Sequence, residues 1–309
     1  MCARHPLIKS FLFLFALVLS ACAAATSPTT TPAPAPSLTQ FDAGTVSGIK
    51  LADIPIVPTV DPAMRAVYQA GLAQGNNPHV FAKLGDCMTE NPYFLGPFGT
   101  GKYDLGAYSD LKPTIEQFYG YPTRGQGWHK DSFETMGLAS AGGFNVAAPL
   151  DATWADPKWC RAGESPLECE YRVSKPSIAI IMFGTNDVNY TDPAAYNFYL
   201  RTIISETLAH DIVPILNTFP TRPENPAKSL LLNQIVVRVA EDYRVPLVNL
   251  NRALEALPNH GVNLTDTTRL STPPDQRVDV FTPQNLQTGF TVRNLVTLQS
   301  LKAVLDTVK

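Results

Sequence analysis

Apolar runs alternate with segments of helical periodicity along most of the chain. Four short apolar runs have the pattern of strands, and the second of them is continuous, as in a strand buried on both faces. They lie at residues 80–84, 177–183, 212–216 and 245–250. Apolar residues recur at helical spacing in three further segments. These segments lie at residues 200–208, 226–243 and 292–308. Strands that alternate with helices predict an α/β fold, with a central parallel sheet and helices on both faces.

The first residues of the chain have the pattern of an export signal. Arg4 and Lys9 form a basic start, and the apolar run that follows them is too short to span a bilayer. The run ends in Leu19-Ser20-Ala21-Cys22, which looks like a bacterial lipobox. We interpret residues 1–21 as a lipoprotein signal peptide and Cys22 as the lipidated residue. The alternative is an ordinary signal peptide cleaved near the same alanines.

Composition separates a linker from the body of the protein. From residue 23 to about residue 40 the chain is almost entirely Ala, Thr, Ser and Pro, which cannot bury enough apolar surface to fold. We therefore expect a lipidated, disordered segment at residues 22–50 and one α/β domain at residues 51–309. The chain would then be an exported bacterial lipoprotein, anchored to the membrane through the lipid on Cys22 and facing the extracytoplasmic side.

Charge and cysteine content narrow the choice of partners. The net charge of −3 provides no basic patch, so nucleic acid is not an expected partner. Cys160 and Cys169 flank a short loop in a compartment where disulfides persist, and we expect them to pair. Cys87 is then left as an unpaired thiol. No pair of histidines has ligand spacing, so we expect no metal ion, and we expect no cofactor.

Three polar blocks stand at positions where chemistry is expected. Gly85-Asp86-Cys87 follows the first predicted strand, and Gly184-Thr185-Asn186-Asp187 follows the second. Both lie at carboxyl ends of parallel strands, where the clefts of such sheets form. The third block, Asp266-Thr267-Thr268-Arg269, lies near the C-terminus. The first two blocks therefore predict a cleft at the carboxyl ends of these strands.

The order and spacing of these blocks resemble the SGNH hydrolases, also called GDSL esterases and lipases. The resemblance covers roughly residues 75–309 and implies a three-layer, flavodoxin-like fold that hydrolyses esters. It assigns oxyanion donors to the Cys87 backbone, to the backbone of Gly143 (with Gly142 as the alternative) and to the Asn186 side chain. Supporting positions in the same blocks are Gly85, Asp86, Gly184 and Asp187.

Two positions depart from the pattern of that family. Cys87 stands where the family has its serine nucleophile, and Arg269 stands where it has its histidine base. A guanidinium stays protonated and cannot act as a base, so we expect Asp266 to form an ion pair with Arg269. Arg269 near Cys87 would also lower the pKa of the thiol. His129 or His260 remains open as a substitute base.

Three functions are compatible with this pattern. The favoured one is a catalytically impaired descendant that binds a small ester, acyl or glycan ligand in the old cleft. The second is an active esterase, lipase or carbohydrate deacetylase that uses Cys87 with an unrecognised base, and the third is a reactive-thiol protein. Whether the chain is an enzyme is therefore left open. Residues 91–127 and 151–171 are predicted as long loops that shape the pocket.

Overall fold

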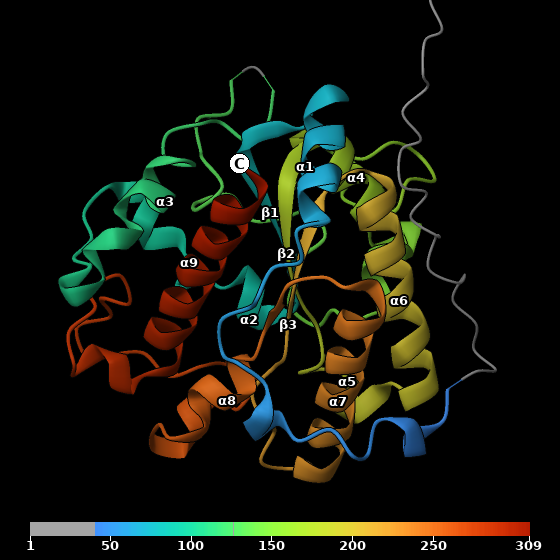
Figure 1. Cartoon of the computed structure of the whole chain (residues 1–309), viewed down its shortest axis with the longest axis vertical. Coiled ribbons are helices and arrows are strands. Elements are labelled where there is room, and N and C mark those ends of the chain that lie inside the picture. The colour runs from blue at the N-terminus through green and yellow to red at the C-terminus, as the bar shows by residue number, and fades with distance from the viewer. Residues whose placement is uncertain (1–40, 126) are drawn as a thin grey trace, which may run out of the picture. The chain divides into compact units, whose positions relative to one another are not determined.

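The computed structural model describes residues 41–125 and 127–309. The signal peptide and the lipidated Cys22 predicted above lie outside the described residues, as does most of the linker. Four parallel strands form one sheet in the order β1-β2-β3-β4 (Figure 1). Their bounds are β1 Asn77–Gly85, β2 Pro176–Met182, β3 Val213–Asn217 and β4 Leu247–Val248.

A short segment adds an edge to this sheet. Ser140 forms a parallel bridge with Gly85, and the Gly85 amide donates to the Ala139 carbonyl oxygen at 3.2 Å. When this bridge is included, the order in space becomes second, first, third, fourth, fifth along the chain, which is the flavodoxin-like order. Clefts of such sheets lie beyond the carboxyl ends of the strands where the chain changes direction, here beside β1.

Helices cover both faces of the sheet. On one face α1 packs with α9, and on the other α6 packs with α7 (Figure 1). The bounds of the helices are α1 Met64–Ala73, α2 Cys87–Glu90, α3 Lys112–Glu116, α4 Pro166–Ser174, α5 Asp187–Tyr190, α6 Pro193–Ala209, α7 Pro226–Tyr243, α8 Leu250–Glu255 and α9 Gly289–Val308. The predicted α/β class is confirmed. Within the described residues, no helix has both the length and the apolar character to cross a bilayer.

Local sequence explains where the main elements begin. Every residue of β2 is buried, as its apolar run predicts. The Asp192 carboxylate accepts the Ala194 N–H, and Pro193 occupies the first turn of α6. In the same way Asn225 caps α7, whose bounds agree with the helical periodicity. Capping and periodicity therefore determine the two helices that precede and follow β3 and that form one layer.

Three segments differ from the expectation. The strand predicted at residues 245–250 is reduced to β4, because the Asn249 side chain accepts the Arg252 N–H and starts α8. Residues 41–50, assigned to the linker, carry a 3-10 helix and bury Val46, which is only 1% exposed. The loop predicted at residues 151–171 contains the start of α4, where Ser165 and Glu168 form a capping box.

Candidate active site

The Gly85–Cys87 turn joins β1 to the short helix α2. The Asp86 carboxylate accepts the Met88 N–H at 3.0 Å and so caps α2, which begins at Cys87. A Cβ added at Gly85 would overlap the Met182 carbonyl oxygen of β2, so only glycine fits where the two strands run this close. The turn thus presents Cys87 at the carboxyl end of β1.

Arg293 of α9 is hydrogen-bonded to the helix that follows this turn. Its guanidinium donates to the Met88 carbonyl oxygen at 2.7 Å and to the Thr89 hydroxyl at 2.9 Å. It also lies 3.7 Å from the centroid of the Phe94 ring. Burial lowers the pKa of Arg293 to about 9, and the neighbouring Asp86 carboxylate opposes that shift. A charged group this deeply buried fixes the position of the thiol-bearing turn.

The second block anchors the loop that contains Gly143. The Asn186 side chain donates to the Phe144 carbonyl oxygen at 2.8 Å, and the Asp187 carboxylate accepts the Val146 N–H at 3.0 Å. Burial raises the pKa of Asp187 to about 6, although the hydrogen bonds it accepts act in the other direction. These two residues therefore pin the backbone directly after Gly143 to the end of β2.

Two glycines in these blocks have conformations that exclude other residues. Gly184 has φ +140°, and a Cβ there would overlap the Phe219 ring. Gly143 has φ +87°, and an added Cβ would meet nothing within 4 Å, so this residue borders open space. Among the described residues, the Gly143 and Cys87 N–H groups donate no hydrogen bond. Both donors, with the second N–H of the Asn186 amide, are available to a ligand oxygen, and their role in an oxyanion hole stays a prediction.

The Cys87 thiol faces the third block. It donates to the Thr268 carbonyl oxygen at 3.3 Å. Burial, together with the charges of Asp86 and Asp266, raises the pKa of the thiol to about 11, against the effect of the Thr268 hydrogen bond. The expectation that Arg269 lowers this pKa was wrong, because the negative charges and burial dominate.

Arg269 is paired with a neighbouring carboxylate. The predicted ion pair is present, with Arg269 Nε 3.0 Å from Asp266 Oδ2, and both side chains are about half exposed. Asp266 also accepts the Thr268 N–H at 3.0 Å, and Arg222 donates to the Thr267 carbonyl oxygen at 2.7 Å. The loop is therefore fixed with a backbone carbonyl, rather than a base, against the thiol.

Two histidines, His129 and His260, were left as candidates for a substitute base. His260 is exposed in a 3-10 helix, with its ring Nδ1 3.0 Å from the Glu255 carbonyl oxygen. His129 is exposed. In the described part of the chain, no histidine is hydrogen-bonded to Cys87. Among the described residues, the hydrogen-bond partner of the thiol is thus a carbonyl oxygen, which cannot take up its proton.

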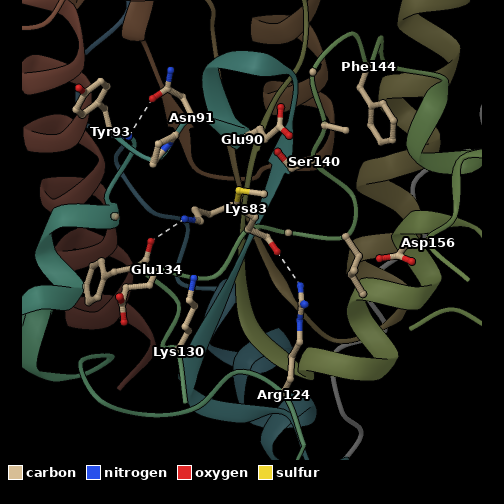
Figure 2. Close-up of a pocket in the computed structure, with 18 of the residues that line it drawn as sticks. Lys83, Glu90, Asn91, Tyr93, Arg124, Lys130, Glu134, Ser140, Phe144 and Asp156 are labelled. Carbon is tan, nitrogen blue, oxygen red and sulfur yellow. Dashed lines mark hydrogen bonds between the residues drawn. The ribbon is translucent and has the colours of Figure 1, made fainter. Parts of the chain in front are cut away.

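Several residues that build the site escaped the sequence analysis. Arg222 and Arg293 come from helical or loop segments far from the three blocks. Lys83 lies in β1, where its ammonium is buried and donates to the Phe133 carbonyl oxygen at 2.8 Å (Figure 2). Burial lowers the pKa of Lys83 to about 7, against the attraction of Asp131. The available signal was a charged residue inside an apolar strand or on the apolar face of a helix.

Comparison with known families agrees with this geometry. The GDSL-like Lipase/Acylhydrolase family matches residues 114–270, which is half of the chain. The chain belongs to this family. The match includes Asn186, Asp187, Asp266 and Arg269, whereas Cys87 lies before it. Within this GDSL-like chain, the assignment of Cys87 to the nucleophile position therefore rests on its place at the end of β1.

The chain is also similar to several solved structures. A lipase/acylhydrolase from Enterococcus faecalis is 17% identical, with a TM-score of 0.47, and the alignment covers 72% of this chain and 95% of that one. A variant of an acetyl xylan esterase from Geobacillus stearothermophilus is 15% identical, with a TM-score of 0.46 and coverage of 73% and 95%. A GDSL-like lipase from Bacteroides thetaiotaomicron is 11% identical, with a TM-score of 0.38 and coverage of 78% and 98%. No curated protein matches the sequence.

Proposed function

We propose that this GDSL-like protein is catalytically impaired and binds a small ester-type ligand, acyl or carbohydrate, in the cleft where its family hydrolyses esters. One observation carries the proposal: the Cys87 thiol donates to the Thr268 carbonyl oxygen at 3.3 Å, in the place where a base would accept its proton. The candidate donors of Gly143, Asn186 and the Cys87 backbone support retained binding of an ester oxygen.

Attack of Cys87 on an ester requires transfer of the thiol proton to another group. A thiol must lose its proton to attack an ester, and the pKa of Cys87 is raised to about 11 by burial and by the nearby carboxylates. Arg269 stays protonated and is paired with Asp266, so it cannot take the proton. A positioned general base contributes about 10²–10⁴-fold to rate, and this site lacks that contribution.

Hydrolysis of p-nitrophenyl acetate tests the impairment. We expect the purified protein and its Cys87→Ala variant to be equally inert. The double variant Cys87→Ser/Arg269→His should turn over, by about 10²–10⁴-fold above the protein itself, because it restores a nucleophile on the turn after β1 and a base in the loop that faces it. The single variants control for each change. Turnover by the protein that Cys87→Ala abolishes would contradict the proposal and establish an active esterase with a different base.

We further propose that the protein is an exported lipoprotein, held at the extracytoplasmic side of a membrane by acyl chains on Cys22. The support is the sequence Leu19-Ser20-Ala21-Cys22 and the Ala/Thr/Pro-rich linker after it. Cell fractionation tests this: Cys22→Ala should move the protein out of the membrane fraction, while the matched Cys87→Ala variant should stay in it. Equal release of both variants, or of neither, would refute anchoring through Cys22.

A further inference from the structure

A large cavity opens beside the Cys87 turn. Its volume is about 860 Å³, within the range of about 300–1,000 Å³ that encloses ligands of the size of a short oligosaccharide. Glu90, the last residue of α2, lines it, and so does Gly142, the neighbour of Gly143 (Figure 2). A ligand in this cavity can therefore extend toward the thiol and the candidate oxyanion donors.

Aromatic side chains gather in this cavity to an unusual degree. All three tryptophans of the sequence, Trp128, Trp154 and Trp159, line it, together with Tyr93 and Phe144. Trp154 is 60% exposed and packs edge-on against Phe144, at 5.9 Å between ring centroids. The indole of Trp154 therefore offers open surface for a flat apolar partner.

Polar groups without partners accompany the aromatic rings. Ser140 and Arg124 are 6% and 9% exposed, and within the described residues the Ser140 hydroxyl and the Arg124 Nε make no hydrogen bond. Both residues line the cavity. Buried polar atoms are normally paired, so these two atoms are poised to bind hydroxyl groups of a ligand.

The charges that line the cavity cancel. Three basic and three acidic side chains contribute, namely Lys83, Arg124, Lys130, Glu90, Glu134 and Asp156 (Figure 2). An anionic ligand would meet three carboxylates, and an acyl chain would leave the Ser140 hydroxyl and the Arg124 Nε without partners. A neutral ligand with many hydroxyl groups and flat apolar faces satisfies both the polar and the aromatic lining.

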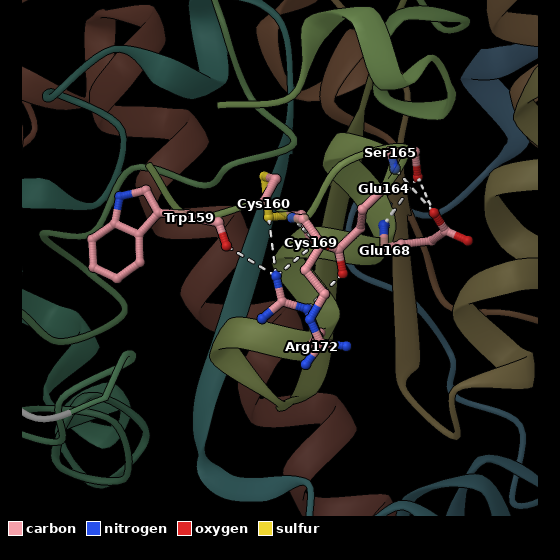
Figure 3. A network of polar contacts seen from close by, with 8 residues as sticks. Trp159, Cys160, Glu164, Ser165, Glu168, Cys169 and Arg172 are labelled. Atoms are coloured by element: carbon pink, nitrogen blue, oxygen red, sulfur yellow. Dashed lines mark hydrogen bonds and ion pairs between the residues drawn. A yellow bond between two sulfur atoms is a disulfide. The ribbon is translucent and has the colours of Figure 1, made fainter. Parts of the chain in front are cut away.

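The wall that carries Trp159 is braced. Arg172 of α4 donates to the Trp159 carbonyl oxygen at 2.9 Å and pairs with Glu164 at 2.5 Å (Figure 3). The predicted disulfide between Cys160 and Cys169 is present and ties the residue after Trp159 to α4. Because the wall is held in place, a ligand does not have to order it on binding.

We propose that this cavity is a binding site for a neutral oligosaccharide. One sugar face stacks on Trp154, and hydroxyl groups bind to Ser140, Arg124 and Glu90. An ester substituent on the sugar would then reach toward the Cys87 turn. The assignment rests on the proposed ligand-binding function in one respect, which is that it names a glycan as the ligand of that function. Binding of an unesterified oligosaccharide does not require that the Cys87 site be active or inactive.

Intrinsic fluorescence provides a selective test, since all three tryptophans line the cavity. The full protein would be titrated with xylotetraose, cellotetraose and tetra-N-acetylchitotetraose, and with decanoate as the acyl probe. We expect at least one tetrasaccharide to change the fluorescence saturably and to bind in calorimetry. Decanoate should do neither. The p-nitrophenyl acetate assay is run on the same samples, so failure of the glycan site and failure of the proposed impairment are read separately.

Variants locate the site. Trp154→Ala should weaken binding by about tenfold, because stacking on an open ring is lost, and Ser140→Ala should also weaken it. Tyr190→Ala is the matched control, as Tyr190 is 81% exposed and does not line the cavity. Circular dichroism verifies that each variant is folded. Binding of decanoate alone, binding of no tetrasaccharide, or equal binding by Trp154→Ala and Tyr190→Ala would each overturn the proposal.

Discussion

The titration of Cys87 is the most direct consequence of the site geometry. Its pKa is raised from the ordinary 9.0 to about 11 by burial and by Asp86 and Asp266. Only the thiolate reacts with alkylating agents. At about pH 8, roughly 0.1% of such a thiol is ionised, against roughly 9% of an ordinary one. Alkylation of the native protein should therefore be about 100-fold slower than that of the denatured protein.

Peptide-level mass spectrometry after timed iodoacetamide treatment measures this rate. Resolution by peptide is needed because Cys2 and Cys22 also occur in the sequence. Rates would be measured from about pH 7 to about pH 11.5, and the midpoint of the rate against pH gives the pKa of the thiol. Restricted access of the reagent would lower every rate equally and would leave this midpoint unchanged. Asp266→Asn should move the midpoint down, because it removes a like charge and keeps an acceptor for Thr268. Asp53→Asn, an exposed substitution in a 3-10 helix, should leave the midpoint unchanged.

The outcome decides between two functions. A midpoint well above the ordinary value agrees with a thiol that is not activated. A midpoint at or below about 9, or native alkylation faster than denatured at about pH 8, would refute the reasoning. It would also revive the reactive-thiol function, with Arg269 as the group that stabilises the thiolate.

Three further predictions concern stability. Burial lowers the pKa of Lys83 from 10.5 to about 7, so the unfolded chain binds the proton more tightly than the folded protein does. The free energy of unfolding should therefore rise between about pH 7 and about pH 9, by up to about 1.4 kcal/mol per pH unit. Urea denaturation should show this slope and its loss in Lys83→Met; an equal slope in both would contradict burial of the ammonium. Replacing Cys160 and Cys169 with alanine should lower the free energy of unfolding by about 2–3 kcal/mol. The measurement is repeated with dithiothreitol, and if the reductant still destabilises the variant, the disulfide is not the source of the effect. Gly184→Ala should cost about 1–3 kcal/mol or more through overlap with a phenylalanine ring, whereas Gly48→Ala, with open space around it, should cost far less; equal melting temperatures would refute the overlap.

Local signals were sufficient for much of the fold. The helix predicted at residues 226–243 has the bounds of α7, because Asn225 and Pro226 begin it where the periodicity begins. The run at residues 177–183 became β2, and the pairing of Cys160 with Cys169 is confirmed. In each case the residues that decide the structure are neighbours in sequence.

The features that were not predicted depend on contacts between residues distant in the sequence. The charged residues Lys83 and Arg293 gain their roles from partners about 50 and 200 positions away, which no local pattern encodes. The edge bridge at Ser140 is a single residue pair, too short for any periodicity. The pKa of Cys87 was misjudged because its largest cause, the burial of the thiol, depends on packing that the sequence does not show.

The order of the cavity residues along the chain has an evolutionary consequence. Every residue that lines the cavity, from Lys83 to Trp159, precedes β2, whereas Asn186 and Arg269 follow it. The wall of the cavity is thus encoded by one uninterrupted stretch of sequence, which ends near the disulfide. Recombination that exchanges this stretch between relatives would alter what the pocket accepts while leaving the strands and blocks after β2 intact. The pocket would then be exchanged together with Cys87 and Gly143, and separately from Asn186 and Arg269.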